Sequence, residues 1–393
     1  LRTVEAIKDI QKTIRFIQQH QHLWPNQISN GTIMVIEKYF LSAIDEIPEN
    51  PTSFSAFSYK MFHGPDFSLA KYSVQHCFDF IKGIQLLIKN FNADAAPDPL
   101  KAILNDAKKI IDNEQLVIVS MYMKSIELTI PLQLKLAHFI RYRFKQQMHA
   151  LLDMYAQLDA WYGMALAVQK YQLVFPEFSI GNQPFLQTKG LYHILLDRPV
   201  SYDVNLIPGS NFLFLTGANM AGKSTFIKSV GAAVFLAHIG MGVPATEMKL
   251  SFFDGLLSNI NVTDNLSRGE SYFYNEVQRI KSTVSKISDG KKWLILIDEL
   301  FKGTNVEDAM KCSSAVIEGL VKIRQSIFIL STHLYEIADA LKVQPNIQFN
   351  YFETSVINEK LVFNYQLKTG VSNDRLGYLI LKNEGVVEML ENL

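Results

Sequence analysis

Apolar residues recur every three or four positions through roughly the first 170 residues, whereas short continuous apolar runs dominate the rest of the chain. Near the start, Val4, Ile7, Ile10, Ile14 and Ile17 fall on one face, with Lys and Gln filling the other. This spacing predicts an amphipathic helix. Similar spacing predicts further helices over residues 33–44, 72–91 and 100–112. The first part of the chain therefore favours an all-helical domain.

Residues 128–171 contain few helix-breaking residues apart from Pro131 and Gly163, which predicts one long helix. If it is continuous over residues 131–171, its length is about 60 Å at about 1.5 Å per residue. Such a helix is either a lever that feeds the next domain or an ordinary member of a bundle. The pattern does not decide between these two interpretations.

One local basic cluster stands out in a chain whose charges balance, with 38 Lys and Arg against 38 Asp and Glu. Without a net positive charge, contact with nucleic acid requires such a local patch. Lys135, Arg141, Arg143 and Lys145 lie close together with no carboxylate among them. A solvated helix face is the more common explanation of such a run, and contact with phosphate is the alternative.

Short apolar strands alternate with helices in the second part, which is typical of a parallel sheet covered on both faces. Strands are predicted over residues 212–216, 293–297 and 327–330. Residues 347–357 and 361–367 predict an antiparallel hairpin at the sheet edge, followed by a final helix over about 374–390. Pro176 and the Gly181–Pro184 stretch indicate a boundary near residue 180. We therefore expect two domains, residues 1–180 and 181–393.

The first of these strands leads into a complete phosphate-binding motif, Gly217 followed by four residues and then Gly222, Lys223 and Ser224. The two glycines let successive backbone N–H groups point at phosphate oxygens, and the helix that follows offers its positive end. Lys223 is expected to reach the β- and γ-phosphates, and Ser224 to ligate Mg²⁺. The motif predicts a nucleoside triphosphate site that uses Mg²⁺.

Polar residues follow the other two predicted parallel strands. Asp298 and Glu299 end the second strand, where Asp298 can hold Mg²⁺ and Glu299 can orient or deprotonate the attacking water. His333 follows the third strand and is placed to reach a γ-phosphate. Ligands bind at the carboxyl ends of strands in open α/β sheets, so we expect these groups to share one site.

A second anion site is predicted at Ser271, which stands at the end of a polar loop and near the start of a helix whose apolar positions run from Phe273 to Ile287. One chain has no obvious use for two such sites. Two copies that each lend this loop to the nucleotide of the other would use both.

Cysteine content and hydropathy limit the class of protein. The chain has two cysteines, Cys77 and Cys312, which excludes a disulfide framework and is typical of a reducing compartment. The longest apolar stretches, such as residues 231–243, are shorter than the roughly 18 residues that span a bilayer. We therefore expect a cytoplasmic protein with no membrane partner. The chain begins with Leu1 rather than Met, so residues that precede it are possible.

Four motifs in order resemble the MutS family of DNA mismatch-repair ATPases, which is related to the ABC-type ATPases. They are Thr-Gly-Ala-Asn-Met-Ala-Gly-Lys-Ser-Thr at 216–225, Asp-Asn-Leu-Ser-Arg-Gly-Glu-Ser-Tyr-Phe at 264–273 with Glu276, Leu-Ile-Asp-Glu-Leu-Phe-Lys-Gly-Thr-Asn at 296–305, and Ser-Thr-His at 331–333. The resemblance implies an α/β, ABC-type P-loop domain with a mixed sheet, preceded by an all-α core and lever domain.

The resemblance also implies roles for individual residues. Nucleotide binding falls to Gly217, Ala218, Asn219, Met220, Ala221, Gly222, Lys223, Ser224 and Thr225. Tyr365 is expected on one face of the adenine and the segment 199–202, with Val200 favoured, on the other. Ser271, with Gly269 in the same loop, would contact the γ-phosphate bound by the opposite subunit of a homodimer. Ser224 and Asp298 would hold the metal, Glu299 would be the catalytic base, and His333 a switch histidine.

The chain departs from the family pattern at several positions. Phe301 and Lys302 replace the usual Gly-Arg, and Pro199 stands where an aromatic residue often packs on adenine. The resemblance does not extend to a mismatch-recognition domain, so we do not expect these residues to read mismatches by themselves.

Three functions follow from these motifs, in order of preference. The first is a MutS-like ATPase that hydrolyses ATP at a composite dimer interface and couples this to DNA binding through the helical domain, in mismatch repair or related DNA processing. The alternative is an ATP-gated protein-interaction module of the same fold. A general ABC-type ATPase of some other assembly is third.

Overall fold

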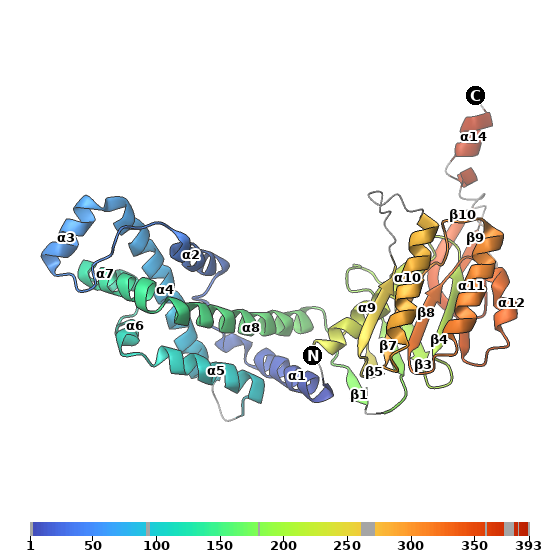
Figure 1. Cartoon of the computed structure of the whole chain (residues 1–393), viewed down its shortest axis with the longest axis horizontal. Coiled ribbons are helices and arrows are strands. Elements are labelled where there is room, and N and C mark those ends of the chain that lie inside the picture. Colours follow the sequence, from blue (N-terminus) through green and yellow to red (C-terminus); the bar gives the residue numbers. More distant parts are fainter. Residues whose placement is uncertain are drawn as a thin grey trace. The chain divides into compact units, whose positions relative to one another are not determined.

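The computed structural model describes residues 3–91, 95–179, 181–260, 272–357, 360–372, 381–383 and 385–391 (Figure 1). The chain divides into two compact units, Asp9–Ala167 and a second that combines Leu1–Lys8 with Val168–Leu393. The division thus differs from the predicted boundary near residue 180. The reason is that Val174 exchanges backbone hydrogen bonds with Val243 of the sheet-containing unit. Ile7 likewise belongs to the apolar core of that unit.

Eight of the described helices lie wholly or mostly in the first unit. In chain order they are α1 Val4–Gln19, α2 Asn30–Leu41, α3 Ser53–Phe62, α4 Gly64–Phe91, α5 Asp98–Ile111, α6 Val117–Met121, α7 Ile130–His138 and α8 Lys145–Lys170. Helix α4 packs against α2, α5 and α7. Its Phe78, Phe80 and Ile81 are completely buried. The predicted all-helical character and the helices near 33–44, 72–91 and 100–112 are confirmed.

The single long helix predicted over 131–171 is wrong. A π-helical turn, Phe139–Arg143, separates α7 from α8, and the Phe144 N–H donates to the Phe139 carbonyl five residues back. Within this turn the guanidinium of Arg141 donates to the carbonyls of Tyr39 and Ser42 at the carboxyl end of α2. It thereby satisfies carbonyls that lack partners within that helix.

Contacts within the helical unit also engage two other members of the basic cluster. A guanidinium nitrogen of Arg143 lies 3.7 Å from the carboxylate of Glu49. The ammonium of Lys145 lies 5.8 Å from the centre of the Phe40 ring. Both side chains stay exposed, so the structural explanation rests mainly on the hydrogen bonds of Arg141.

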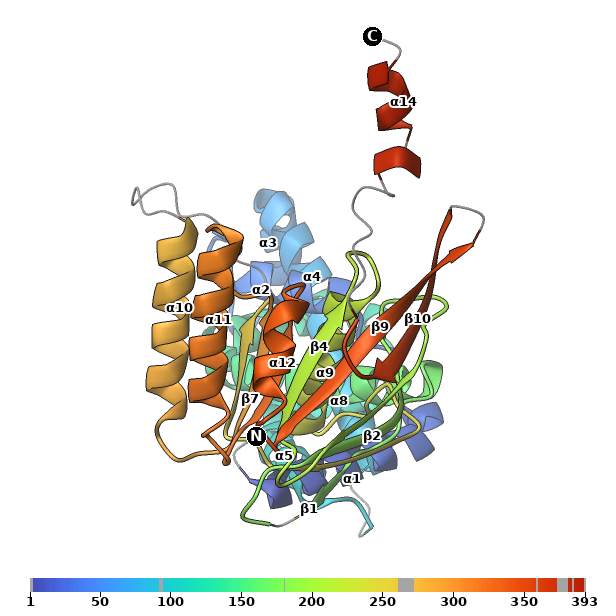
Figure 2. The same cartoon turned by 90° about the vertical axis from the view of Figure 1, so that its right-hand side faces the viewer.

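A six-stranded mixed sheet forms the centre of the second unit (Figure 2). The strand order is β10-β9-β4-β8-β7-β6, with bounds β4 Phe212–Gly217, β6 Gly255–Asn259, β7 Trp293–Asp298, β8 Ile327–Ser331, β9 Ile347–Ile357 and β10 Lys360–Thr369. Strands β9 to β6 in this order pair in parallel, and β10 is antiparallel to β9 at the edge. The three predicted parallel strands and the edge hairpin are confirmed.

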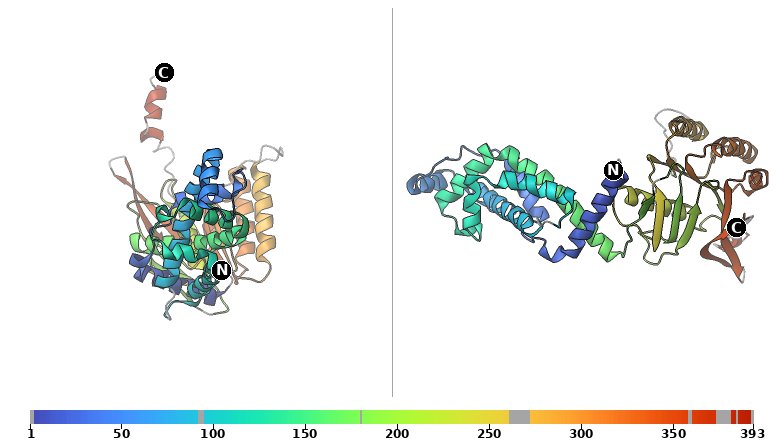
Figure 3. Two further views of the ribbon diagram at one scale, coloured as in Figure 1. Left: turned by 90° about the vertical axis from the view of Figure 1, so that its left-hand side faces the viewer. Right: turned by 90° about the horizontal axis from the view of Figure 1, so that it is seen from below.

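Helices cover both faces of this sheet because its central strands are apolar on both sides. Leu213 and Leu215 of β4 pack in one core with helix α9, Lys223–His238. Phe212 and Phe214 pack in the opposite core with α10 Tyr272–Ile287 and α11 Val306–Leu320. The orange α10 and α11 lie together on one side of the sheet in the right-hand view of Figure 3.

A smaller sheet, not predicted, flanks the α9 side. Its order is β1-β5-β2-β3, with bounds β1 Glu177–Ser179, β2 Leu186–Leu191, β3 Tyr202–Leu206 and β5 Glu247–Ser251. Two short helices complete the unit, α12 Ala338–Leu341 and α14 Val386–Glu391. Most of the first half of the predicted final helix falls outside the described residues. Among the described residues, no helix is both long and apolar enough to cross a membrane.

Candidate functional site

The phosphate-binding motif forms one wall of a pocket of about 470 Å³ in the sheet-containing unit. The pocket is lined by Leu196, Arg198, Val200, Tyr202, Ala218, Asn219, Met220, Gly222, Lys223, Ser224, Thr225, Glu299 and Tyr365. Most of the residues that the sequence assigned to nucleotide binding therefore meet in one cavity, although they come from three separate parts of the chain. The pocket lies where β4 ends and α9 begins.

The loop between β4 and α9 has a backbone that only certain residues adopt readily. Gly217 has a φ of 138° and Gly222 a φ of 111°, and Met220 also has a positive φ of 66°. A Cβ at position 217 would lie 3.0 Å from the backbone oxygen of Phe352. Glycine at 217 is therefore required both by conformation and by space.

Lys223 is almost fully buried at the start of α9, with 5% of its surface exposed. Its ammonium donates to the carbonyls of Gly217 at 2.7 Å and Ala218 at 2.9 Å. Burial lowers the pKa of Lys223, while the nearby carboxylates of Glu299 and Asp298 oppose that shift. The ammonium is thus held within the loop. Phosphate oxygens bound there could replace the two carbonyls as acceptors of its hydrogen bonds.

Two hydroxyls hold the carboxylate of Asp298 at the end of β7. Ser224 donates to Oδ2 at 2.6 Å, and Ser331 at the end of β8 donates to Oδ1. Asp298 itself is 8% exposed. The Ser224 hydroxyl and the Asp298 carboxylate are hard oxygen donors, the type that Mg²⁺ prefers. The residues present therefore fit the magnesium ion that the motif implies.

Glu299 lies next to this pair and has an unusual backbone, with a φ of 65°. Its Oε2 is 2.9 Å from the ammonium of Lys302 and 3.7 Å from Nδ1 of His333. The nearby His333 and, after it, Lys302 lower the pKa of Glu299 to about 2, and burial opposes this shift. The carboxylate is therefore ionised and held on the rim of the phosphate site.

Val200 and Tyr365 lie in the same pocket as the phosphate loop. Tyr365 is 40% exposed and has a φ of 55° at an irregularity in β10. Its ring passes close to Gly222, where an added Cβ would be 3.4 Å from Cδ1. Both residues assigned to the adenine through the resemblance are thus within reach of a nucleotide in this pocket.

Two pocket residues were missed by the sequence reasoning, Leu196 and Arg198. They lie in a segment without helical or strand periodicity, so only their nearness to Val200 could have indicated them. Tyr202, the last residue of the segment 199–202 expected beside the adenine, also lines the pocket. Its ring packs edge-on against Phe226 and Phe352 beneath the loop.

Ser271 and Gly269 lie outside the described residues, as does the rest of 261–271. Their predicted place opposite the nucleotide of a second subunit stays a prediction.

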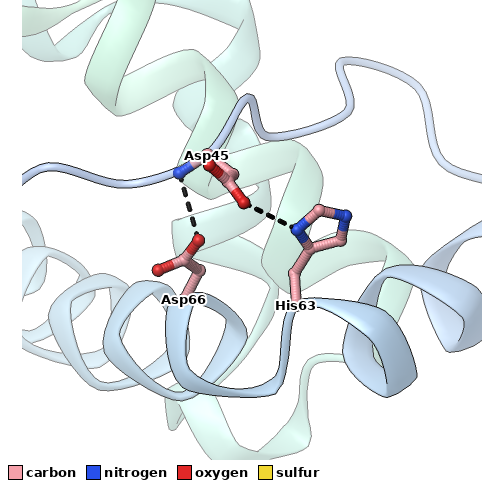
Figure 4. Close-up of side chains that lie close together, drawn as sticks. All are labelled: Asp45, His63 and Asp66. Atoms are coloured by element: carbon pink, nitrogen blue, oxygen red, sulfur yellow. Dashed lines mark hydrogen bonds and ion pairs between the residues drawn. The ribbon is translucent and has the colours of Figure 1, made fainter.

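A separate group of polar side chains in the helical unit brings Asp45, His63 and Asp66 together (Figure 4). Nδ1 of His63 lies 2.9 Å from Oδ2 of Asp45, and the Asp45 N–H donates to Asp66 at 3.1 Å. These hydrogen bonds fasten the segment after α2 to the corner between α3 and α4. They account for the cluster as a structural contact.

Comparison with protein families agrees with the site. Residues 213–390 match the family model described as MutS domain V, and this range contains the phosphate loop, Asp298, Glu299 and His333. The matched part of the chain belongs to the MutS family. The matched range starts in β4 and includes the sheet-forming strands β6 to β10.

Individual MutS proteins extend the similarity beyond that range. The DNA mismatch repair protein MutS of Thermotoga maritima is 26% identical over 80% of this chain and 40% of its own length. The protein of the same name from Staphylococcus haemolyticus is 26% identical over 72% of this chain and 32% of its own. Human MutS protein homolog 4 is 30% identical over 58% of this chain and 25% of its own. The chain thus spans well under half of these relatives.

Proposed function

We propose that this MutS-family chain is a Mg²⁺-dependent ATPase that hydrolyses ATP to ADP and phosphate at a composite site shared by two copies. One observation supports this most strongly: Lys223, the Ser224–Asp298 pair and Glu299 converge on one pocket. The same pocket holds Val200 and Tyr365 beyond the phosphate loop, where a base would follow the phosphates.

The chemistry assigned to each group follows from its position. The Lys223 ammonium and the loop N–H groups bind the β- and γ-phosphates, and Ser224 and Asp298 hold Mg²⁺, which when bound neutralises charge on the phosphate oxygens. Glu299 aligns the attacking water and accepts its proton as the new P–O bond forms and the bond to ADP breaks. His333, beside Glu299, reports the presence of the γ-phosphate.

The proposal also includes a homodimer and binding to DNA. Ser271 and Gly269 would complete the nucleotide site of the partner copy, which requires a face-to-face dimer. Coupling to DNA is suggested by relatives whose name is DNA mismatch repair protein MutS. Closure of the dimer on ATP would then move the helical unit, through which DNA is bound.

A second candidate function retains the ATPase activity, with a protein in place of DNA as the binding partner. Arg141 is engaged by hydrogen bonds inside the helical unit, and the exposed Arg143 and Lys145 make weaker contacts there, which reduces the basic surface left for phosphate. This observation favours an ATP-gated protein-interaction module, because such a module needs no phosphate-binding surface.

DNA-stimulated ATPase activity of the full-length protein separates the two candidates. Duplex, branched and mismatched DNA are titrated at two salt concentrations while ATP turnover is followed. Stimulation by one DNA form, with affinity that falls steeply with salt, supports the DNA-coupled ATPase. ATP turnover without any DNA binding supports the interaction module, and absence of ATP turnover contradicts both.

A further inference from the structure

Glu276 on α10 is a buried carboxylate with an unusual pair of partners. It is 4% exposed, although a glutamate at this depth normally needs a compensating partner. Its Oε1 accepts from the Lys302 N–H at 3.1 Å and its Oε2 accepts from the Gly303 N–H at 3.2 Å. Both donors belong to the loop that follows the catalytic candidate Glu299. One side chain therefore holds two successive peptide groups of that loop.

The same loop is packed tightly against the first turn of α10. A Cβ at Gly303 would lie 2.8 Å from the backbone nitrogen of Phe273, so any other residue would push the loop away. Phe301, with a φ of 55° and 4% exposure, packs its ring 5.6 Å from that of Phe273. This left-handed backbone at a large side chain persists only where the surroundings fix it.

Lys302 connects this anchor to the pocket. Its backbone N–H is held by Glu276, while its ammonium contacts the Glu299 carboxylate at 2.9 Å. Lys302 thus connects the two carboxylates, since Glu276 binds its backbone N–H and Glu299 binds its ammonium. A displacement of α10 relative to the sheet would be transmitted to Glu299 through Lys302.

We infer that Glu276 is a positioning residue of the ATPase: through Lys302 it sets the place of the Glu299 carboxylate and links that place to α10. The inference rests on the proposed function for its reaction.

Kinetics of Glu276→Gln in the full-length protein test the inference. Glutamine keeps the size of the side chain but replaces one acceptor by an N–H₂ group that cannot accept from the loop. We expect kcat for ATP to fall about 10- to 100-fold, the scale of a displaced catalytic group, while KM and ATP affinity change less than about 3-fold. Glu318→Gln on α11 removes an exposed glutamate of the same unit and should leave kcat unchanged.

A double variant distinguishes positioning from general destabilisation. If Glu276 acts through Lys302, then Lys302→Met also lowers kcat, and the double variant falls no further than the worse single variant. If the fold-losses in kcat of the two single variants multiply in the double variant, the inference is overturned. A Glu276→Gln enzyme with wild-type kcat would also overturn it, as would one whose ATP affinity falls as much as its kcat.

Hydrogen exchange at residues 300–305 provides a readout that does not need hydrolysis. We expect Glu276→Gln to speed exchange of the 302 and 303 amides while the rest of the sheet stays protected. If the variant loses protection throughout, Lys302→Met carries the kinetic test alone. A wild-type protein without ATPase activity contradicts the proposed function. In that case the exchange measurement still tests whether Glu276 holds the loop. Unchanged exchange of the 302 and 303 amides in Glu276→Gln would overturn this, and faster exchange of these two amides alone would support it.

Discussion

The Ser224 hydroxyl donates a 2.6 Å hydrogen bond to Asp298, a residue 74 positions later in the chain. Ser224 stands at the start of α9 and Asp298 at the end of β7, so the contact joins the phosphate loop to a strand that is not its neighbour. Strand β8 lies between β4 and β7, and its Ser331 donates to the other oxygen of Asp298. The metal candidates are therefore held together by the order of the strands.

Ser224→Ala should abolish Mg²⁺-dependent hydrolysis. The substitution removes one expected metal ligand and leaves Asp298 with Ser331 alone, so we expect kcat to fall at least about 100-fold, the scale of a lost electrostatic contribution to the transition state. Turnover is measured against Mg²⁺ concentration. Ser288→Ala, at an exposed end of α10, is the control. Wild-type Mg²⁺ dependence in Ser224→Ala would remove Ser224 from the metal site.

Glu299→Gln should stop steady-state hydrolysis and leave ATP binding. Glutamine retains the shape of the side chain but cannot accept the proton of the attacking water. Equilibrium ATP binding and phosphate release are measured on the same preparation. Turnover equal to that of the wild type would reject Glu299 as the base.

Tyr365→Ala should weaken binding of ATP but not of inorganic tripolyphosphate. Tyr365 lines the pocket, and loss of a stacked aromatic ring costs about 1–3 kcal/mol per base. Competition of the two ligands against a fluorescent ATP analogue gives both affinities. Equal weakening of the two ligands would show that Tyr365 supports the phosphate loop instead of binding the base.

The parallel sheet could be predicted because its strands are continuous apolar runs. Phe212 to Leu215, for example, face two cores at once, a pattern that neither a loop nor a surface helix produces. The placement of Asp298 and Glu299 followed from the same reasoning, since parallel strands end at one edge. Val200 and Tyr365 have no such pattern and were reached through the family resemblance alone.

The missed features depend on contacts between distant residues. The π-helical turn before Phe144 exists where Arg141 meets α2, and no pattern within residues 128–171 contains that contact. The smaller sheet had a readable signal in β3, Tyr202–Leu206, whose residues alternate between buried and exposed. Arg198 entered the pocket from a segment without periodicity.

His238 should make the sheet-containing unit less stable as the pH falls. Burial lowers the pKa of this imidazole, whose Nε2 accepts from the Phe253 N–H at 2.9 Å while Nδ1 donates to the Val234 carbonyl. The unfolded state binds the proton more readily, so stability is complete above the unfolded pKa of about 6.5 and declines as the pH falls below it. Thermal unfolding from pH 8 to pH 5 measures this. The decline should be smaller in His238→Gln, and parallel curves would contradict the role.

Arg141→Met tests whether the basic cluster is structural. Its guanidinium donates to Tyr39 and Ser42 and stacks 5.1 Å from the Tyr39 ring, so the variant leaves carbonyls of α2 without partners. Hydrogen bonds to charged groups contribute about 1.5–3 kcal/mol, and we expect a loss of this order in the unfolding free energy of the helical unit.

Lys135→Met provides the matched control, since it removes the same charge from the cluster and should cost little stability. ATP affinity should be unchanged in both variants. If Arg141→Met instead keeps wild-type stability and lowers DNA affinity with a reduced salt slope, Arg141 is a phosphate contact. The structural explanation of the cluster would then be wrong. The cluster would instead be a DNA-binding surface, which would support the DNA-coupled function.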